Sequence, residues 1–228
     1  MLESDFTALW LTIKLAAITS IILLVICFPF AWWLARYQGR CKAMLEAVVA
    51  LPLVLPPTLL GFYLMVVFSP SSSLGQFWLW LTGTQLAFSF SGVVLGSLIY
   101  SLPFVMQPLL AGISQVNSHY IQAAQALGFS ANKRFFYLLI PLLKKNMLSA
   151  FALGFAHTLG EFGLVLMIGG NLPGETQVVS IALYDHVESL NYTAAHQLSL
   201  ILLGISFFCL VLLFKFNRSA LTGRNHHA

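Results

Sequence analysis

Charge is scarce in this sequence, and its absence limits the classes of protein that the chain can form. Only 8% of the 228 residues are Asp, Glu, Lys or Arg, whereas 59% are hydrophobic. The mean hydropathy is +0.87. A soluble domain of this composition would precipitate, because too few polar side chains are present to cover its surface. The sequence therefore predicts an integral membrane protein.

Cysteine is also rare, with three residues in the chain. Cys27 and Cys209 fall inside apolar runs and Cys41 falls in a short basic segment, so no two suggest a disulfide or a metal-binding pair. No His, Cys or Asp grouping has metal-ligand spacing, and no pattern is typical of a catalytic triad. We therefore expect neither a metal site nor a catalytic centre in this chain.

The chain also lacks the motifs of nucleotide-binding and nucleic-acid-binding proteins. It contains no G-x-x-x-x-G-K-S/T loop to hold phosphates, so it is not expected to hydrolyse ATP. Its net charge of +4 is not gathered with aromatic side chains on a soluble module, which argues against nucleic acid as a partner. The basic residues need a different explanation.

Long uncharged runs alternate with clusters of basic residues. Ten of the eleven Lys and Arg residues lie in three clusters, and none lies in 69–85 or 169–194. Short basic loops stay on the cytoplasmic side of a membrane. The alternation predicts five crossings, with the N-terminus outside and the C-terminus inside. The clusters are Arg36, Arg40 and Lys42; Lys133, Arg134, Lys144 and Lys145; and Lys215, Arg218 and Arg224.

The apolar runs predict an all-α membrane protein with a single transmembrane domain over 1–228. A helix of roughly 20 apolar residues crosses a hydrocarbon core of about 30 Å. Proline in the second and third runs is expected to kink or break these helices, either because they line a pathway or as ordinary kinks of a helical bundle. The predicted helices are 9–34, 47–68, 86–110, 146–168 and 195–214.

The predicted cytoplasmic loop 112–145 is unusually long and encodes a short helix of its own. Ser118 is a suitable N-cap, and Gly128 suits the left-handed position that ends a helix. Small side chains on one face permit close approach to another surface, as docking requires. A helix that lies on lipid headgroups, favoured by Lys133 and Arg134, is the alternative. The shared face consists of Tyr120, Ala123, Ala124 and Leu127.

The spacing in this loop resembles the Glu-Ala-Ala loop of ABC-importer membrane subunits, whose pattern is E-A-A-x3-G-x9-I-x-L-P. Gln122 stands for Glu, Leu138 for Ile and Ile140 for Leu, while all offsets match. The resemblance implies that the helix docks on an ATPase subunit. The basic stretch that follows is expected to end at Pro141, before the membrane. The implied coupling residues are Tyr120, Gln122, Ala123, Ala124, Leu127, Gly128 and Pro141.

Later segments resemble the sulfate and molybdate branch of these permeases: Thr158-Leu-Gly-Glu-Phe-Gly163, 169–176 and 180–184. The resemblance implies a type I importer permease of the inner (plasma) membrane that carries molybdate, with sulfate or tungstate as alternatives. It also implies a homodimer, two cytoplasmic ATPase subunits that bind ATP and Mg, and one soluble oxyanion-binding protein outside.

Glu161 is the only acidic residue inside an apolar run. A charge at the centre of a membrane helix costs about 3 kcal/mol, so such residues are functional candidates. A carboxylate repels an oxyanion, which favours a structural or gating role with a hydrogen bond to His157, one turn away. The alternative is a proton-coupled secondary transporter that uses Glu161. Such a protein would have inverted repeats and more intramembrane ionisable groups, which the sequence lacks.

The membrane runs contain a single cation, Lys14, near the outer end of the first run. We therefore expect the oxyanion to be selected by the external binding protein and to pass hydroxyl and backbone N–H groups. Thr58, Ser97 and Ser101 lie near prolines and are the candidate pathway hydroxyls. Hydrogen bonds to carbonyls of their own kinked helices are the alternative. A channel or a membrane scaffold, a third class, would not need the docking loop.

Overall fold

The computed structural model describes residues 3–222, and its regular elements are all helical. The predicted all-α class is confirmed for this part of the chain. Arg224 and the side chain of Arg218, assigned to the third basic cluster, lie outside the described part. The elements are α1 (Glu3–Arg36), α2 (Lys42–Ala50), η1 (Leu51–Leu53), α3 (Pro57–Phe68), α4 (Ser73–Thr82), α5 (Phe90–Ser114), α6 (Ser118–Ala126), α7 (Ala131–Lys133), η2 (Arg134–Leu139), α8 (Ile140–Leu159), α9 (Gly163–Gly169), α10 (Val179–Glu188) and α11 (Tyr192–Thr222).

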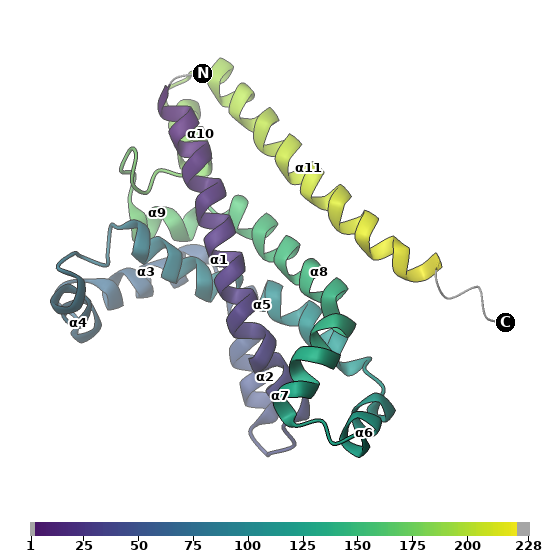
Figure 1. Cartoon of the computed structure of the whole chain (residues 1–228). Helices are drawn as coiled ribbons and strands as arrows, with labels where there is room; N and C mark the ends of the chain where they lie inside the picture. Colours follow the sequence, from purple (N-terminus) through teal and green to yellow (C-terminus); the bar gives the residue numbers. More distant parts are fainter. Residues whose placement is uncertain (1–2, 223–228) are drawn as a thin grey trace.

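The long helices α1, α5 and α8 pack against one another and form the centre of the molecule (Figure 1). Their shared core contains fully buried Leu34, Met106 and Leu109. Helices α5 and α8 approach closely at Gly154, where an added Cβ atom would lie 2.6 Å from Cγ2 of Val105. Real Cβ atoms do not approach so closely, so the contact requires glycine, and the two helices meet with no room to spare.

Four helical stretches are long and apolar enough to cross a membrane: α1, α5, Ala131–Leu159 and Tyr192–Leu212. A fifth crossing is possible if the bent pair Lys42–Leu53 and Pro57–Phe68 counts as one span, although the two parts meet at 104°. The five predicted crossings agree with the larger of these two counts.

Two adjacent prolines account for the bend. Pro56 is extended, with φ −56° and ψ 134°, and Pro57 is the first residue of α3. Proline lacks an N–H group and disfavours helical geometry in the residue before it, so the helix stops at this pair. Helix α3 packs instead on α9, where a Cβ on Gly61 would lie 2.7 Å from the Cβ of Met167.

The third run does not break at its prolines. Helix α5 continues through Pro103 and Pro108. It is packed between α1 and α8, and the Asn146 amide donates a hydrogen bond to the Pro108 carbonyl at 3.3 Å. Packing against these two helices keeps α5 continuous although each proline removes one helical hydrogen bond.

The fourth membrane helix begins earlier than the expected 146–168. Helical structure starts at Ala131 and runs through the π-helix η2 into α8. Pro141 therefore does not end the basic stretch. It lies in the first turn of α8, directly after the wider turns of η2, and this position tolerates a residue without an N–H donor.

This helix also ends earlier than expected. Helix α8 stops at Leu159, residues 160–162 are not helical, and α9 follows as a separate short helix. Glu161 therefore lies in a break between two helices, where backbone groups and side chains of neighbouring elements can reach it.

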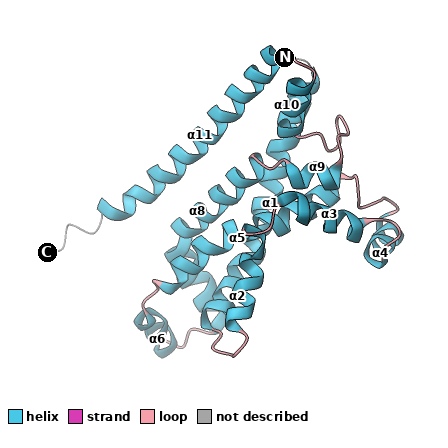
Figure 2. Cartoon of the chain, turned by 180° about the vertical axis from the view of Figure 1, so that it is seen from behind, coloured by secondary structure: helices cyan, strands magenta, loops and turns pink. Residues whose placement is uncertain are grey.

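Helix α11 diverges from the bundle (Figures 1 and 2). It packs on α10 and on part of α8, and most of its length points away from the core. Several of its apolar side chains are exposed as a result: Leu200, Leu203, Phe207, Phe208 and Phe214.

Candidate coupling segment and intramembrane polar cluster

The short helix α6 forms where it was predicted, but Asn117 rather than Ser118 caps its N-terminus. The Asn117 side chain accepts a hydrogen bond from the His119 N–H at 2.9 Å. Asn117 has the extended backbone of an N-cap residue, whereas Ser118 is already the first residue of the helix.

Gly128 ends this helix in the way that the sequence predicts. Its φ is +75°, in the left-handed region. The Phe129 N–H bonds the Ala124 carbonyl and the Gly128 N–H bonds the Gln125 carbonyl, both at 2.9 Å. These two bonds satisfy carbonyl groups at the end of the helix and fix the chain reversal that leads into α7.

The predicted docking face is divided between solvent and the protein interior. Tyr120 is 57% exposed and Leu127 is 76% exposed, whereas Ala124 is only 7% exposed. Gln122 and Ala123 are also exposed. Ala124 therefore packs within this chain, and the surface available to a partner is formed by Tyr120, Gln122, Ala123 and Leu127.

Ser97 and Glu161 meet inside the helical bundle. The Ser97 hydroxyl donates to Oε2 of Glu161 at 3.0 Å, and both residues are buried. The Ser180 hydroxyl of α10 donates to the Glu161 carbonyl at 2.7 Å. Glu161 Oε1 is buried and has no hydrogen-bond partner within the described part of the chain. Two hydrogen bonds thus fix the break after α8: the Glu161 side chain accepts one from α5, and the Glu161 carbonyl accepts one from α10.

The expected bond between Glu161 and His157 does not form, because α8 ends before Glu161. His157 instead places Nδ1 2.9 Å from the Ser101 hydroxyl and stacks on Phe104, with ring centroids 3.7 Å apart. Ser101 also lies 3.0 Å from the Thr158 hydroxyl. Ser97 and Ser101 therefore bond to residues of α8 and of the segment after it, whereas Thr158 bonds the Gly154 carbonyl of its own helix at 3.0 Å.

Thr58 lies apart from this set of hydrogen bonds. It is exposed near the start of α3, and its Cγ2 lies 3.1 Å from the position that a Cβ on Gly163 would occupy. The structure thus brings Ser97, Ser101 and Glu161 together, and it places Thr58 beside the first residue of α9.

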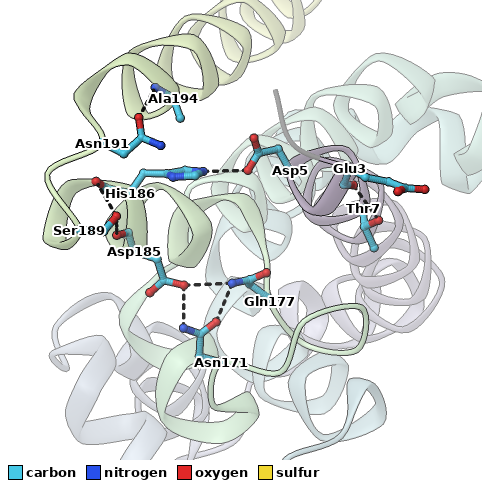
Figure 3. A network of polar contacts seen from close by, with 10 residues as sticks. All are labelled: Glu3, Asp5, Thr7, Asn171, Gln177, Asp185, His186, Ser189, Asn191 and Ala194. Atoms are coloured by element: carbon cyan, nitrogen blue, oxygen red, sulfur yellow. Dashed lines mark hydrogen bonds and ion pairs between the residues drawn. The ribbon is translucent and has the colours of Figure 1, made fainter.

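A second group of polar contacts at the other end of the bundle could not be anticipated from the sequence (Figure 3). Asp5 Oδ1 lies 2.8 Å from His186 Nε2, which joins α1 to α10 across 181 positions. Beside this pair, Asp185 accepts hydrogen bonds from Asn171 at 2.7 Å and Gln177 at 3.0 Å. No motif signals these contacts, because they depend on how α10 packs on α1 and on the segment between α9 and α10.

Within 3–222, no group of three or more His, Cys, Asp or Glu side chains lies together as metal ligands would. The intramembrane polar cluster consists of Ser97, Ser101, His157, Thr158 and Glu161. It contains one carboxylate, one imidazole and three hydroxyl groups in a tightly packed environment. This arrangement is suited to holding helices together and exchanging hydrogen bonds when they move.

Comparisons with known proteins agree with these features. Residues 27–221 match the family model described as "Binding-protein-dependent transport system inner membrane component". The chain is 45% identical over 216 residues to "Molybdenum transport system permease protein ModB" of Azotobacter vinelandii, covering 95% of this chain and 96% of that protein. It is 32% identical to the ModB protein of Haemophilus influenzae, covering 81% of each chain.

Two solved structures of ABC transporters share this fold. A bacterial transporter "involved in the import of the acidic polysaccharide alginate" aligns with a TM-score of 0.75 at 15% identity, over 97% of this chain and 80% of that one. The MetNI methionine transporter aligns with a TM-score of 0.71 at 15% identity, over 96% and 99% of the two chains. The chain therefore belongs to the family of inner-membrane components of binding-protein-dependent transport systems.

Proposed function

We propose that this chain is the translocation subunit of an ATP-driven importer of a tetrahedral oxyanion, and that the oxyanion is molybdate. The Azotobacter protein of 45% identity carries molybdenum in its name. A Marchantia polymorpha protein named "Probable sulfate transport system permease protein cysT" is 32% identical over 95% of this chain and 74% of that protein. Sulfate is thus the second candidate, together with tungstate, which has the same shape and charge as molybdate.

The proposed assembly contains two copies of this chain, two ATPase subunits and one external binding protein. ATP and Mg would bind to the ATPase subunits, because this chain has no phosphate-binding loop. The basic clusters favour an orientation with α6 on the cytoplasmic side and the N-terminus of α1 outside. This orientation would give the ATPase subunits access to α6 and the binding protein access to the opposite end.

The observation that carries the proposal is the geometry of α6. Its exposed residues Tyr120, Gln122 and Leu127 form a surface that this chain leaves uncovered, and Gly128 fixes how the helix ends. The helix is connected to α5 on one side and to α7 and α8 on the other. A displacement of α6 by an ATPase subunit would therefore act directly on the two central helices that carry the polar cluster.

In this mechanism the polar cluster acts as a gate. Ser97 and Ser101 are fully buried and already bonded, so an oxyanion can meet their hydroxyls only after α5 separates from the end of α8 and from the segment that follows it. Glu161 would hold the closed state by accepting the Ser97 hydrogen bond. Thr58, exposed beside α9, is the candidate hydroxyl that needs no such release.

Reconstitution tests this function. The permease, its ATPase and its binding protein would be placed in lipid vesicles and supplied with labelled molybdate. We expect uptake that requires ATP and the binding protein and that tungstate inhibits. A preference for sulfate would change the proposed substrate. Uptake driven by a proton gradient without ATP would support the secondary transporter instead.

A further inference from the structure

A cavity of about 540 Å³ opens among the ends of α1, α2, α5 and α6 that face the proposed cytoplasmic side. Its wall is apolar along α5 and charged along α1 and α2. The residues that line it include Trp32, Arg36, Lys42, Glu46, Leu110 and Ser118.

The protein neutralises the positive charge in this cavity only in part. Arg36 and Lys42 both line the wall, and Glu46 is the one carboxylate beside them. Within the described part of the chain, neither cation forms a salt bridge. Arg134 is close enough to Arg36 for the two positive charges to repel each other, which adds to the positive potential of this region. Two cations against one carboxylate leave the cavity with a net positive charge, which favours binding of an anion.

The Arg36 side chain is already positioned for such a role. Its guanidinium carbon lies 3.4 Å from the centroid of the Trp32 ring. This cation–π contact restricts the side chain and leaves the edge of the guanidinium available, so less side-chain entropy is lost when an anion binds.

Two helix N-termini reach the same cavity. Lys42 is the first residue of α2 and Ser118 is the first residue of α6, and both line the wall. The N-cap of α2, Cys41, makes no side-chain capping hydrogen bond, and the first turn carries no acidic residue. The partial positive charge of these helix ends adds to that of the two cations.

The remaining wall distinguishes a lipid from a small soluble anion. Leu110 and its neighbours on α5 give the cavity an apolar side. Trp33 and Tyr37 stack on each other at 5.1 Å, beside a second cavity of about 510 Å³ that shares Trp32 and Arg36. Tryptophan and tyrosine gather at the level of lipid headgroups, and a small anion would need no apolar wall.

We propose that this cavity binds the phosphate group of an anionic phospholipid from the cytoplasmic leaflet, with acyl chains along the apolar side of α5. Basic pockets between membrane helices at this surface are suited to such headgroups. The inference takes from the proposed function only the orientation in the membrane. The experiment measures bound lipid and not transport. A negative result would therefore reject the lipid site without affecting the proposed importer function.

The test uses the purified complex of permease and ATPase after removal of lipid. Phosphatidylglycerol is titrated back and retained lipid is counted by native mass spectrometry. Arg36→Gln and Lys42→Gln should each weaken binding about fivefold, since one cation near a membrane surface contributes ~1 kcal/mol. The matched control is Arg40→Gln, which removes a cation from the same loop but not from the cavity. It should bind as the wild type does.

Three outcomes would overturn the proposal. Equal retention by all variants, or equal binding of zwitterionic phosphatidylcholine, would mean that the cations do not recognise the lipid charge. Binding of inorganic phosphate that displaces the lipid would make this a soluble oxyanion site. Cross-linking of Lys42→Cys to the ATPase in the assembled complex would mean that a protein partner covers the cavity.

Discussion

Ser97 and Glu161 are 64 positions apart and meet through one hydrogen bond in the interior of the bundle. A buried carboxylate is costly unless its oxygens are bonded, and one oxygen of Glu161 already has no partner among the described residues. Separation of α5 from the segment after α8 would break the buried hydrogen bond between Ser97 and Glu161, so this pair would resist opening of the proposed gate. The pair is therefore a sensitive place to probe the closed state.

Replacement Ser97→Ala should remove the remaining bond of the Glu161 carboxylate to α5. We expect a loss of stability of about 1–3 kcal/mol, because a buried acceptor is left unsatisfied. Transport of molybdate and tungstate should fall in parallel, since selection is assigned to the binding protein. Thermal unfolding of the purified complex and uptake assays measure the two effects.

The control for this change is Ser114→Ala on the same helix. Ser114 is exposed and bonds only the Ala111 carbonyl of its own helix, so its loss should change stability by less than about 0.5 kcal/mol. Equal stability of the two variants would remove Ser97 from the gate. A tenfold change in the preference of Ser97→Ala for molybdate over sulfate would move selectivity into the membrane.

Asp5 and His186 form the other residue pair with a testable role. Asp5 is 2% exposed, and its contact with His186 closes α1 against α10. A double-mutant cycle with Asp5→Asn and His186→Gln should give a coupling energy of about 1–3 kcal/mol in thermal unfolding. Glu175→Gln, an exposed change on the same side of the molecule, should have no coupling with either. Additive effects of the first two changes would show that the pair contributes no joint stability.

At the scale of elements, α6 shows what local sequence can predict. A glycine with positive φ and bonds between residues five or fewer positions apart suffice to end this helix, so Gly128 was predictable. The local sequence did not predict which side of α6 faces solvent, because the burial of Ala124 depends on how α6 packs on the rest of the chain. Ala123, which is exposed, is the better position at which to block docking.

Gly128→Val should damage coupling through strain alone, since nothing lies within 4 Å of an added Cβ and only the φ of +75° opposes the side chain. Ala123→Glu should place bulk and charge on the docking surface. Both variants should insert in the membrane yet lose the ATPase on co-purification, or hydrolyse ATP without transport.

Gly128→Asn and Gln122→Glu serve as controls for these variants. Asparagine tolerates the left-handed conformation, and glutamate restores the residue usual in the resembling loops. Both should keep coupled transport. Normal transport by Gly128→Val and Ala123→Glu would instead favour α6 as a helix that lies on headgroups.

The proline-containing helices show a second limit of local reasoning. Two adjacent prolines bend the α2–α3 pair by 104°, because Pro57 keeps the residue before it, Pro56, out of helical geometry. The same residue type leaves α5 and α8 continuous, since α5 is packed between two helices and Pro141 follows a π-helix. The end of α8 at Leu159 in turn decides that Glu161 meets Ser97 rather than His157. None of these neighbours is visible in the local sequence.

At the scale of the whole molecule, the alternating basic clusters predict an orientation that labelling can test. In a cysteine-free background, Ser73→Cys and Asn191→Cys should react with an impermeant maleimide applied from outside. Ala131→Cys should react only after the inner membrane is opened. All three positions are exposed, so accessibility does not depend on unfolding. Labelling of Ala131→Cys in intact cells would reverse the orientation and separate α6 from the ATPase.

The connections of α6 have a mechanical consequence. Three residues, 115–117, join it to α5, and four residues, 127–130, join it to α7. Such short links contain almost no slack. In the proposed importer, a push on α6 would therefore be transmitted to α5 and to α8 at the same time. The short connections would also limit ATP hydrolysis without transport, because the ATPase could not complete its conformational change unless the proposed gate moved as well.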